Sequence, residues 1–452
     1  MVDAVAASVE PILGPVTATV EPLLEAIPSR VRTVRGGLRP RGGAAHEKPQ
    51  TEPYCTAFHF GLPSEEKWVV TANNGPSEWR LTEPDRCWRT YVTMERKIKG
   101  RGALSNAEGR FARYRTDPDI DALAEAAAAS EEDEPSRIAT TLHIDSARSI
   151  IARNNSPDIS FSQSINPYKG CEHGCIYCYA RATHSYLDLS PGRDFETEIF
   201  YKPNAVALLR EELAAPRYEV SPIAMGTNTD PYQPVERGLK VTRGILELLL
   251  ELKHPTTIVT KGALILRDLD VLRALAEQNL VAVHVSLTTL DDELKRRMEP
   301  RTAGPKQRLN MVRQLAGAGI PTGVMLAPII PALNDHELEG MLEAAAENGA
   351  GSAGYVLLRL PHEVAPLFAE WLRVQYPDRA EHVLSLLRQL HGGAVYDSQF
   401  HHRQRGHGPF AALLKARFAK ARRRYGLERE VALCTDLFVP PRPERPQLDL
   451  GF

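Results

Sequence analysis

From about residue 160 onward, the chain alternates short apolar runs with longer amphipathic segments. Runs of this length predict strands, and the helical spacing of the segments between them predicts helices. Repeated alternation indicates a parallel sheet, either doubly wound or rolled into a barrel, and the order alone does not distinguish the two. The six runs are FSQSINPY (161–168), PIAMGT (222–227), TTIVTKG (256–262), VAVHVSLTT (281–289), TGVMLAPII (322–330) and AGYVLLRLP (353–361).

Helical segments separate these runs and dominate the chain beyond residue 361. Several end in Gly, or in Asn followed by Gly or Leu, as helices often do. The segments between the runs are PNAVALLREELA (203–214), TRGILELLLEL (242–252), LRDLDVLRALAEQ (266–278), KQRLNMVRQLAGAG (306–319) and HELEGMLEAAAENG (336–349). Three further segments predict a C-terminal helical extension: VAPLFAEWLRVQY (364–376), AEHVLSLLRQL (380–390) and FAALLKARFAKARRRYGL (410–427).

The first 97 residues differ in composition from the rest. Residues 1–50 are rich in Ala, Val, Pro and Gly, and residues 51–97 show no strong periodicity. This predicts a disordered or weakly structured extension. We also raise the hypothesis that natural translation begins at Met94. We assign the remaining regions as 98–160, a lead-in segment with an acidic linker; 161–365, the α/β core; and 366–452, the C-terminal helical extension and tail.

Composition and charge limit the function classes. The 452 residues contain 55 Lys and Arg against 57 Asp and Glu, a formal net charge of −2. This balance argues against a generic, charge-driven nucleic-acid binder. No stretch reaches the roughly 18 apolar residues that a membrane span needs, and the N-terminus does not have the pattern of a signal peptide. We therefore expect a cytoplasmic protein without a membrane segment, in a compartment where thiols stay reduced.

Three cysteines, Cys171, Cys175 and Cys178, lie within the short stretch CEHGCIYC. A disulfide would leave one thiol unpaired and suits a reducing compartment poorly. Thiolates are soft ligands that suit zinc and iron–sulfur clusters. Zinc takes four ligands, and His173 or His184 is available as the fourth. The stretch therefore predicts a metal centre of one of these two kinds.

An iron–sulfur cluster explains why there are three thiols. A [4Fe–4S] cluster held by three thiolates leaves one iron without a protein ligand, and an open metal position is where chemistry takes place. Gly170 precedes the stretch and Gly174 lies within it. Glycine permits the turns that a short loop around a cluster requires.

At this point the stretch resembles the C-x3-C-x-aromatic-C signature of the radical SAM superfamily, with Tyr177 as the aromatic residue. The resemblance implies a partial (β/α)6 barrel. It also implies that Cys171, Cys175 and Cys178 bind a [4Fe–4S] cluster, that S-adenosylmethionine occupies the open iron, and that Tyr177 packs near the adenine. An electron from a flavodoxin- or ferredoxin-like donor would then release a 5′-deoxyadenosyl radical, which abstracts hydrogen from a substrate.

Polar side chains follow several predicted strands, and the active sites of barrels lie at the carboxyl ends of strands. Lys261 is the strongest candidate, because an ammonium there could hold the carboxylate of S-adenosylmethionine, with Ser286 or Asn228 completing a polar cradle. The competing interpretations are a solvated loop lysine at 261 and a simple turn at Asp230. The full set of strand-end candidates is Thr227, Asn228, Thr229, Asp230, Lys261, Ser286, Thr288 and Arg359.

Within the superfamily, the chain is similar to the branch of spore photoproduct lyase, often described as DNA-repair photolyase-like. The stretches INPYKGCEHGCIYCYAR, TNTDPYQPVE and TIVTKG carry this likeness, within Asn166–Leu360. It implies that Asn228, Lys261 and Ser286 hold S-adenosylmethionine. Photoproduct lyases also carry a cysteine near the end of the second strand that returns hydrogen, whereas MGTNTDPYQ has none. Cys434 could replace it only if the C-terminal segment folds over the barrel mouth.

Two functions therefore stay open. The first is a lyase-like radical S-adenosylmethionine enzyme acting on an unidentified substrate, with nucleic acid as one candidate. The second is a non-catalytic zinc or iron–sulfur protein with a structural or redox-sensing role. The basic run KARFAKARRRYGL is either a solvated helix face or a phosphate-binding one.

Other polar groups have structural interpretations. In ALNDHELE, Asn334 and Glu337 predict a capping box at a helix start. In QFHHRQRGHGP, we interpret His401, His402 and His407 as part of a polar loop rather than as a metal site. The remaining cysteines are expected to be ordinary thiols: Cys55, Cys87 and Cys434.

Overall fold

The computed structural model describes residues 69–72, 79–82, 100–112 and 138–441, and the chain divides into two compact units, Met1–Pro84 and Asp85–Phe452. In the first unit, β1 (Val69–Ala72) pairs antiparallel with β2 (Trp79–Thr82). The rest of the predicted N-terminal extension, the acidic linker and the proposed start at Met94 lie outside the described residues, as do Cys55 and Cys87.

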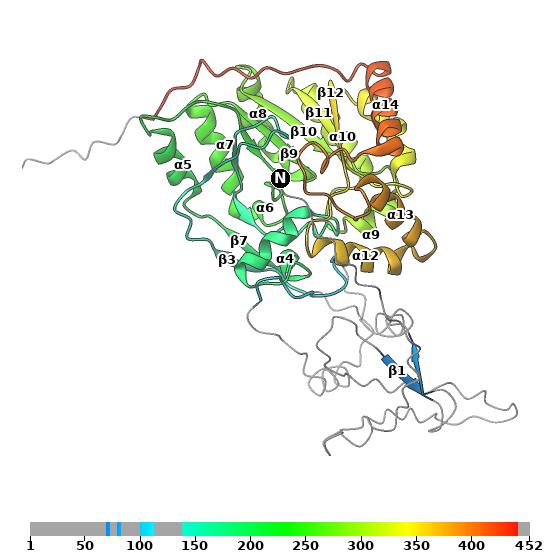
Figure 1. The fold of residues 1–452 in the computed structure, drawn as a ribbon. Coiled ribbons are helices and arrows are strands. Elements are labelled where there is room, and N and C mark those ends of the chain that lie inside the picture. Colours follow the sequence, from blue (N-terminus) through cyan, green and yellow to red (C-terminus); the bar gives the residue numbers. More distant parts are fainter. Residues whose placement is uncertain (1–68, 73–78, 83–99, 113–137, 442–452) are drawn as a thin grey trace, which may run out of the picture. The chain divides into compact units, whose positions relative to one another are not determined.

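Six parallel strands form the main sheet of the second unit, and each falls on one of the six apolar runs (Figure 1). The strands follow one another in sequence across the sheet, and β4 (Ile151–Arg153) pairs antiparallel with the first of them. In this sheet β12 and β4 are edges that do not pair with each other, so the barrel is partial, as predicted. The parallel strands are β5 (Gln163–Ile165), β8 (Ile223–Met225), β9 (Thr256–Thr260), β10 (Val281–Ser286), β11 (Thr322–Ile329) and β12 (Ser352–Leu357).

Helices join successive strands and cover the outer face of the sheet (Figure 1). Their apolar stripes explain this position: in α7, Ile245 and Leu249 are fully buried in the same core as Ile258 of β9 and Val283 of β10. The helices of this layer are α5 (Ala205–Leu213), α6 (Glu236–Leu239), α7 (Val241–Glu251), α8 (Leu269–Ala276), α9 (Asp292–Met298), α10 (Pro305–Gly317) and α11 (Leu338–Glu347).

A second, three-stranded sheet lies beside the start of the barrel. In it β7 (Glu198–Tyr201) pairs parallel with β3 (Thr141–Ile144) and antiparallel with β6 (Tyr168–Lys169). The chain leaves this sheet directly after β6, passes through the three cysteines and returns in β7. The small sheet therefore anchors both ends of the cysteine-bearing segment.

The C-terminal part is helical, as predicted, with α12 (Val364–Gln375), α13 (Pro377–Leu390) and α14 (Gly408–Arg424). After α14 the chain runs across the end of the barrel at which the parallel strands begin. This segment is drawn in red in Figure 1. There the backbone N–H of Val439 donates to the carbonyl of Leu252, which precedes β9. This final segment therefore packs on the amino ends of the strands.

The predicted capping box before α11 is wrong. The side chain of Asn334 makes no capping hydrogen bond; instead its amide accepts from Ile330 N (2.6 Å) and donates to the carbonyls of Thr288 (2.8 Å) and Pro328 (3.0 Å). Glu337 accepts from Leu290 N and from the Thr289 hydroxyl. Both side chains hold loops at the carboxyl ends of β10 and β11 together, and tertiary contacts have displaced the local motif.

Candidate active site

The three cysteines lie on a loop, residues 170–178, whose turns require glycine. Gly170 (φ 79°) and Gly174 (φ 67°) both adopt the left-handed conformation, as the sequence predicted. A Cβ atom at Gly170 would come within 2.9 Å of the Glu198 carbonyl oxygen, so the space excludes larger residues as well. We call residues 170–178 the cysteine loop.

A buried ion pair fixes the outer side of the cysteine loop. Arg181 and Glu196 are both fully buried and pair with each other. Arg181 also donates through Nε to the carbonyl of Cys175 (2.9 Å) and through Nη1 to that of Gly192 (2.7 Å). Because its N–H groups are matched to carbonyl and carboxylate oxygens, this arginine holds the loop in one conformation.

The inner side of the loop is tied to the carboxyl ends of the barrel strands. Gln233, in the segment after β8, accepts from Glu172 N (2.9 Å) and donates to the carbonyl of Gly170 (3.2 Å). Ile176 N donates to the carbonyl of Met298 (3.1 Å), at the end of α9. The loop therefore sits at the end of the barrel where active sites of this architecture form.

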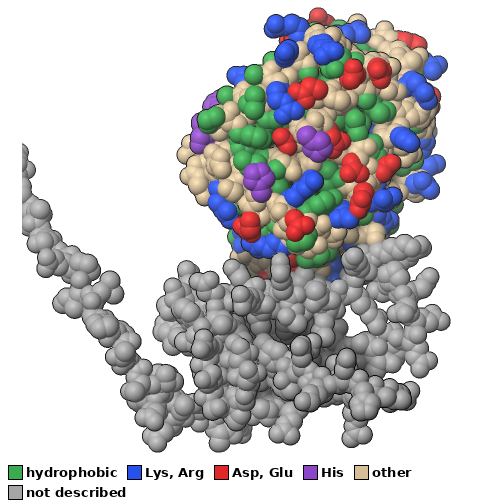
Figure 2. All heavy atoms as spheres, turned by 90° about the vertical axis from the view of Figure 1, so that its right-hand side faces the viewer, with side chains coloured by type: hydrophobic (Ala, Val, Ile, Leu, Met, Phe, Trp, Pro, Cys, Tyr) green, Lys and Arg blue, Asp and Glu red, His purple; other side chains and the backbone are tan. Residues whose placement is uncertain are grey.

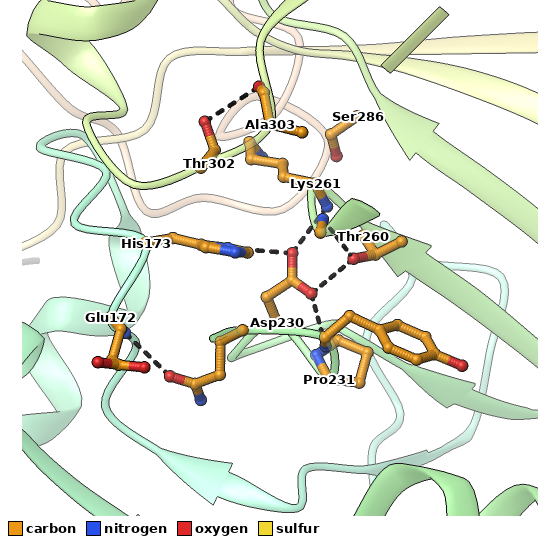
Figure 3. Close-up of polar contacts among 12 residues, drawn as sticks. Glu172, His173, Asp230, Pro231, Thr260, Lys261, Ser286, Thr302 and Ala303 are labelled. Carbon is orange, nitrogen blue, oxygen red and sulfur yellow. Dashed lines mark hydrogen bonds and ion pairs between the residues drawn. The ribbon is translucent and has the colours of Figure 1, made fainter. Parts of the chain in front are cut away.

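Asp230 links the loop to two strands (Figure 3). Its carboxylate accepts from Thr260 Oγ1 (2.6 Å) and Lys261 N (2.7 Å), and lies 3.3 Å from His173 Nδ1. Burial alone would raise the pKa of Asp230, but the charge and hydrogen bond of His173, with the hydrogen bonds from Lys261 and Thr260, lower it to about 2. Asp230 also accepts from Tyr232 N, so the predicted turn and a site role coexist in one residue.

The three thiols suit a positively charged metal cluster. All three are free, and Cys171 and Cys175 are buried. Burial raises the pKa of each thiol, that of Cys175 to about 12. Thiolates in such a site need a compensating cation, and iron supplies it. The donor set therefore fits a cluster held by Cys171, Cys175 and Cys178.

The alternative of a single zinc ion fits less well. Tetrahedral zinc brings its thiolate sulfurs to about 3.8 Å from one another. In the described part of the chain, these three sulfurs do not form a donor group within 4.8 Å, so their spacing is wider than one ion requires. Of the two proposed fourth ligands, His173 faces Asp230 and His184 Nε2 lies 3.0 Å from the carbonyl of Glu198.

The predicted cosubstrate-binding residues differ in how closely they approach the cysteine loop. Lys261 Nζ is 5.9 Å from the centroid of the Tyr177 ring, and its charge acts on the thiols of Cys175 and Cys178. Tyr177 is buried, and Ser286 is a buried residue at the end of β10.

Asn228 follows β8 in a half-buried position, and its backbone N–H donates to Asn166 Oδ1 (3.2 Å). Its neighbour Thr229 has a structural role, because its hydroxyl donates to the carbonyl of Tyr168 (2.9 Å). The end of β9 thus brings Lys261 to the cysteine loop, and the backbone N–H of Asn228 fixes the chain after β8 to Asn166.

Glu299 is a member of the site that sequence reasoning missed. It is fully buried, pairs with Arg308 of α10, and accepts hydrogen bonds from the hydroxyls of Tyr177 and Thr288. Burial alone would raise its pKa, but the charges of Arg308 and Lys261 lower the pKa of Glu299 to about 2. No sequence motif indicates a role for Glu299, because its partners come together only when α9 and α10 pack beside the cysteine loop.

Arg359 follows β12 at the carboxyl ends of the barrel strands, the end that we call the mouth. Its guanidinium is 4.9 Å from the centroid of the Tyr179 ring, and Tyr179 directly follows Cys178. The buried Nε of Arg359 has no hydrogen-bond partner. Burial raises the pKa of Tyr179. The charges of Arg359 and of Arg403, from the loop after α13, act in the opposite direction.

Cys434 does not reach this site. Its backbone N–H donates to the carbonyl of Asn279 (2.9 Å), which precedes β10, so Cys434 lies at the amino ends of the strands. The mouth is at their carboxyl ends. The hypothesis that Cys434 returns hydrogen to a substrate is therefore wrong, because the C-terminal segment folds over the other end of the barrel.

The basic run of α14 is partly committed to internal contacts. Arg417 binds both carboxylate oxygens of Glu339 in α11 (2.8 and 2.7 Å), and Arg422 donates to the carbonyl of Leu427. On the face that carries α12, α13 and α14, lysines and arginines are interspersed with acidic residues (Figure 2). This face therefore has no broad basic surface of the kind that binds nucleic acid by charge alone.

Comparisons with known proteins agree with this class of fold. The family model described as Radical SAM superfamily matches residues 165–345. A Mycobacterium tuberculosis protein, Uncharacterized protein Rv2578c, is 38% identical over 237 residues, covering 52% of this chain and 70% of that one. A Methanocaldococcus jannaschii protein, Uncharacterized protein MJ0683, is 28% identical over 173 residues, covering 38% and 62%.

Solved structures give weaker likenesses. Spore photoproduct lyase complexed with dinucleoside spore photoproduct has a TM-score of 0.48 at 16% identity, covering 75% of this chain and 91% of that one. Streptococcus suis SuiB bound to S-adenosylmethionine has a TM-score of 0.35 at 16% identity, covering 50% and 47%.

The chain belongs to the radical SAM superfamily. It is accordingly a radical S-adenosylmethionine enzyme, whose cofactors are a [4Fe–4S] cluster and S-adenosylmethionine and which needs an electron donor. Among the described residues, no helix is long and apolar enough to cross a membrane.

Proposed function

We propose that this enzyme abstracts hydrogen from an anionic substrate, with its cofactors held at the carboxyl ends of the barrel strands. Cys171, Cys175 and Cys178 would bind the cluster. The observation that carries the proposal is the meeting of three free thiols with the Lys261 ammonium at that end of the barrel.

Four side chains are the proposed ligands of S-adenosylmethionine. Lys261 would pair with its carboxylate, Ser286 and Asn228 would hydrogen-bond to its polar groups, and Tyr177 would pack near its adenine. Bound there, the cluster and S-adenosylmethionine supply a one-electron cleavage of the sulfonium to methionine and a 5′-deoxyadenosyl radical. Two neighbouring carboxylates would keep Lys261 in place. Asp230 accepts a hydrogen bond from the backbone N–H of Lys261, and Glu299 interacts with the charge of its side chain.

The position of Arg359 favours an anionic substrate. A guanidinium with an unpartnered N–H beside the cysteine loop is suited to a phosphate or carboxylate. Nucleic acid, in a lyase-like or photolyase-like reaction, is the candidate we favour. Because the net charge is −2 and the face in Figure 2 is mixed in sign, we propose that recognition involves one or a few nucleotides in the mouth rather than a broad surface.

The electron donor we propose is a flavodoxin- or ferredoxin-like protein, and the location is the cytoplasm, where the three thiols stay reduced before the cluster is loaded. A donor of this kind delivers one electron at low potential, which the cleavage requires.

Cofactor chemistry can be tested without knowing the substrate. Anaerobically loaded protein, given dithionite and S-adenosylmethionine, is expected to form 5′-deoxyadenosine. The Cys175→Ala variant should lose its cluster and form none. If wild-type protein with a complete cluster forms no 5′-deoxyadenosine, a non-catalytic cluster protein becomes the better description.

The substrate class needs a separate test. We expect DNA oligonucleotides, intact or ultraviolet-irradiated, to raise the rate of 5′-deoxyadenosine formation in wild type and less so in Arg359→Ala. Arg373→Ala is the control, because Arg373 lies in an exposed surface ion pair on α12. Rates unaffected by any oligonucleotide would exclude these substrates and leave the cofactor chemistry intact.

A further inference from the structure

The loop between α13 and α14, residues 391–407, gathers side chains that ligate metals. Donor atoms of Asp397, His402 and His407 all lie within 4.8 Å of one another. The sequence predicts a polar loop that contains His401, His402 and His407, whereas the structure places the donor atoms of His402 and His407 beside Asp397. The structure instead turns His401 toward Asp158 (3.6 Å). The spacing D-x4-H-x4-H was present in the sequence but is unremarkable without the fold.

Backbone contacts hold these donors in position. Gly406 N donates to the carbonyl of His402 (2.7 Å), and His407 N donates to that of Leu390 (3.0 Å) at the end of α13. The carbonyl of Gln404 accepts from Leu357 N of β12 (2.9 Å). The two imidazoles meet edge to face, with ring centroids 5.6 Å apart. The loop is therefore fixed at both ends of the group rather than free at the surface.

A second observation points to a ligand. His391, at the start of the same loop, is 4% exposed, and neither of its ring nitrogens has a hydrogen-bond partner. Burial and the charge of His407 lower the pKa of His391, whereas the charge of Asp397 and a backbone contact with Leu358 raise it. The next residue, Gly392, lies beside the group, because a Cβ atom there would be 3.5 Å from His407 Cε1. Burying an imidazole with both nitrogens unsatisfied is unfavourable. A metal ion at Asp397, His402 and His407, with its bound water, would supply a partner beside it.

We propose that Asp397, His402 and His407 bind one divalent transition-metal ion of the zinc type, separate from the iron–sulfur cluster. Two imidazoles and one carboxylate are a ligand set that zinc uses with a water in its fourth position. Calcium and magnesium prefer sites made entirely of oxygen ligands, which this group is not. His402 is exposed, so an ion can enter from solvent.

The site would fasten a loop that reaches the barrel mouth. Between His402 and His407 the chain carries Arg403, which pairs with Asp158 and acts on Tyr179 beside the cysteine loop. A metal ion that joins His402, His407 and the preceding Asp397 restrains the whole turn that presents Arg403. Its role is structural, and it does not depend on the proposed substrate.

Metal content of the full chain tests the proposal directly. Protein purified anaerobically, loaded with iron and dialysed against chelator-buffered zinc is analysed for zinc and iron by mass spectrometry. We expect about one zinc ion per wild-type chain, in addition to the cluster iron, and none in His402→Ala/His407→Ala with its iron retained. Cys175→Ala should show the reverse, losing iron and keeping zinc.

His401→Ala is the matched control, because it removes the adjacent exposed histidine and should keep its zinc. Zinc should also raise the melting temperature of wild type and His401→Ala but not that of the double variant, since only a bound ion stabilises the folded state. If the double variant does not fold, His402→Gln replaces it. Equal zinc content in wild type, control and variant, or zinc in none of them, overturns the proposal.

Discussion

Buried carboxylates organise the active site at the scale of single residues. The pKa values of Asp230 and Glu299 are both lowered to about 2 by their neighbours, His173 for one and Arg308 with Lys261 for the other, although burial raises them. Each anion attracts groups from different strands or helices to one place. The position of the cysteine loop thus depends on pairs of residues that are distant in sequence.

Lys261 is the residue whose replacement should most affect cosubstrate binding. A charge-assisted contact contributes about 1.5–3 kcal/mol, so Lys261→Ala should weaken S-adenosylmethionine binding by about 10- to 100-fold. Equilibrium dialysis with cluster-loaded protein measures this. Lys306→Ala, an exposed lysine of α10, is the control. Wild-type affinity in Lys261→Ala would return Lys261 to the role of a loop lysine.

Asp230→Asn should loosen the cysteine loop, because it weakens the contact with His173 and the hydrogen bonds from Thr260 and Lys261. Groups that support metal ligands typically contribute 10- to 100-fold to metal affinity. We expect correspondingly faster transfer of iron to a chelator under anaerobic conditions. The control is Asp270→Asn, whose carboxyl also has a pKa lowered to about 2, mainly by its hydrogen bond with Arg243, but lies at the surface. Equal iron loss from both variants would contradict the role of Asp230.

At the scale of elements, the ion pair of Arg181 and Glu196 joins the segment after the cysteine loop to α4 (Asp194–Thr197). Glu196→Gln leaves a fully buried guanidinium without its counter-charge, which should lower the free energy of unfolding by about 3–5 kcal/mol. Urea denaturation of cluster-free protein measures this. In the exposed pair on α12 and α13, Glu381→Gln should cost less than about 1 kcal/mol. Similar losses in both variants would refute the assignment.

The periodic elements were predictable from the sequence because their burial pattern is local. All six parallel strands and the main helices coincide with the apolar and amphipathic runs. The three-stranded sheet was not predicted, since β6 has only two residues and β3 has an exposed face with no clear alternation. The capping box at Asn334 failed for a related reason: the same side chain satisfies three buried backbone groups of neighbouring loops.

The candidate site was predictable where the chemistry lies in one short stretch. The cysteines, Gly170 and Gly174 follow from their spacing, and Lys261 follows from its place after a strand. Glu299 and the group at Asp397 could not be found in this way. Their partners come from separate helices or opposite ends of a loop, so only the packed structure brings them together.

For the whole molecule, the last segment closes the amino ends of the barrel, away from the chemistry. Phe438 packs against His254 and Tyr218, with ring centroids 5.1 and 5.8 Å apart. Deletion of residues 431–452 should lower the melting temperature by a few degrees, about 2–4 °C per kcal/mol lost. Formation of 5′-deoxyadenosine per loaded cluster should be unchanged. A loss of that activity without a change in melting temperature would place the segment at the active site.

Electron–nuclear double resonance of the reduced, cluster-loaded enzyme tests the central claim, that Cys171, Cys175 and Cys178 are the only protein ligands and leave one iron for the cosubstrate. The sample contains S-adenosylmethionine labelled with ¹⁷O in its carboxylate and ¹⁵N in its amino group. The account predicts hyperfine coupling of both labels to the cluster. A complete cluster that shows neither coupling while a fourth side chain of the protein is bound to it would contradict the account.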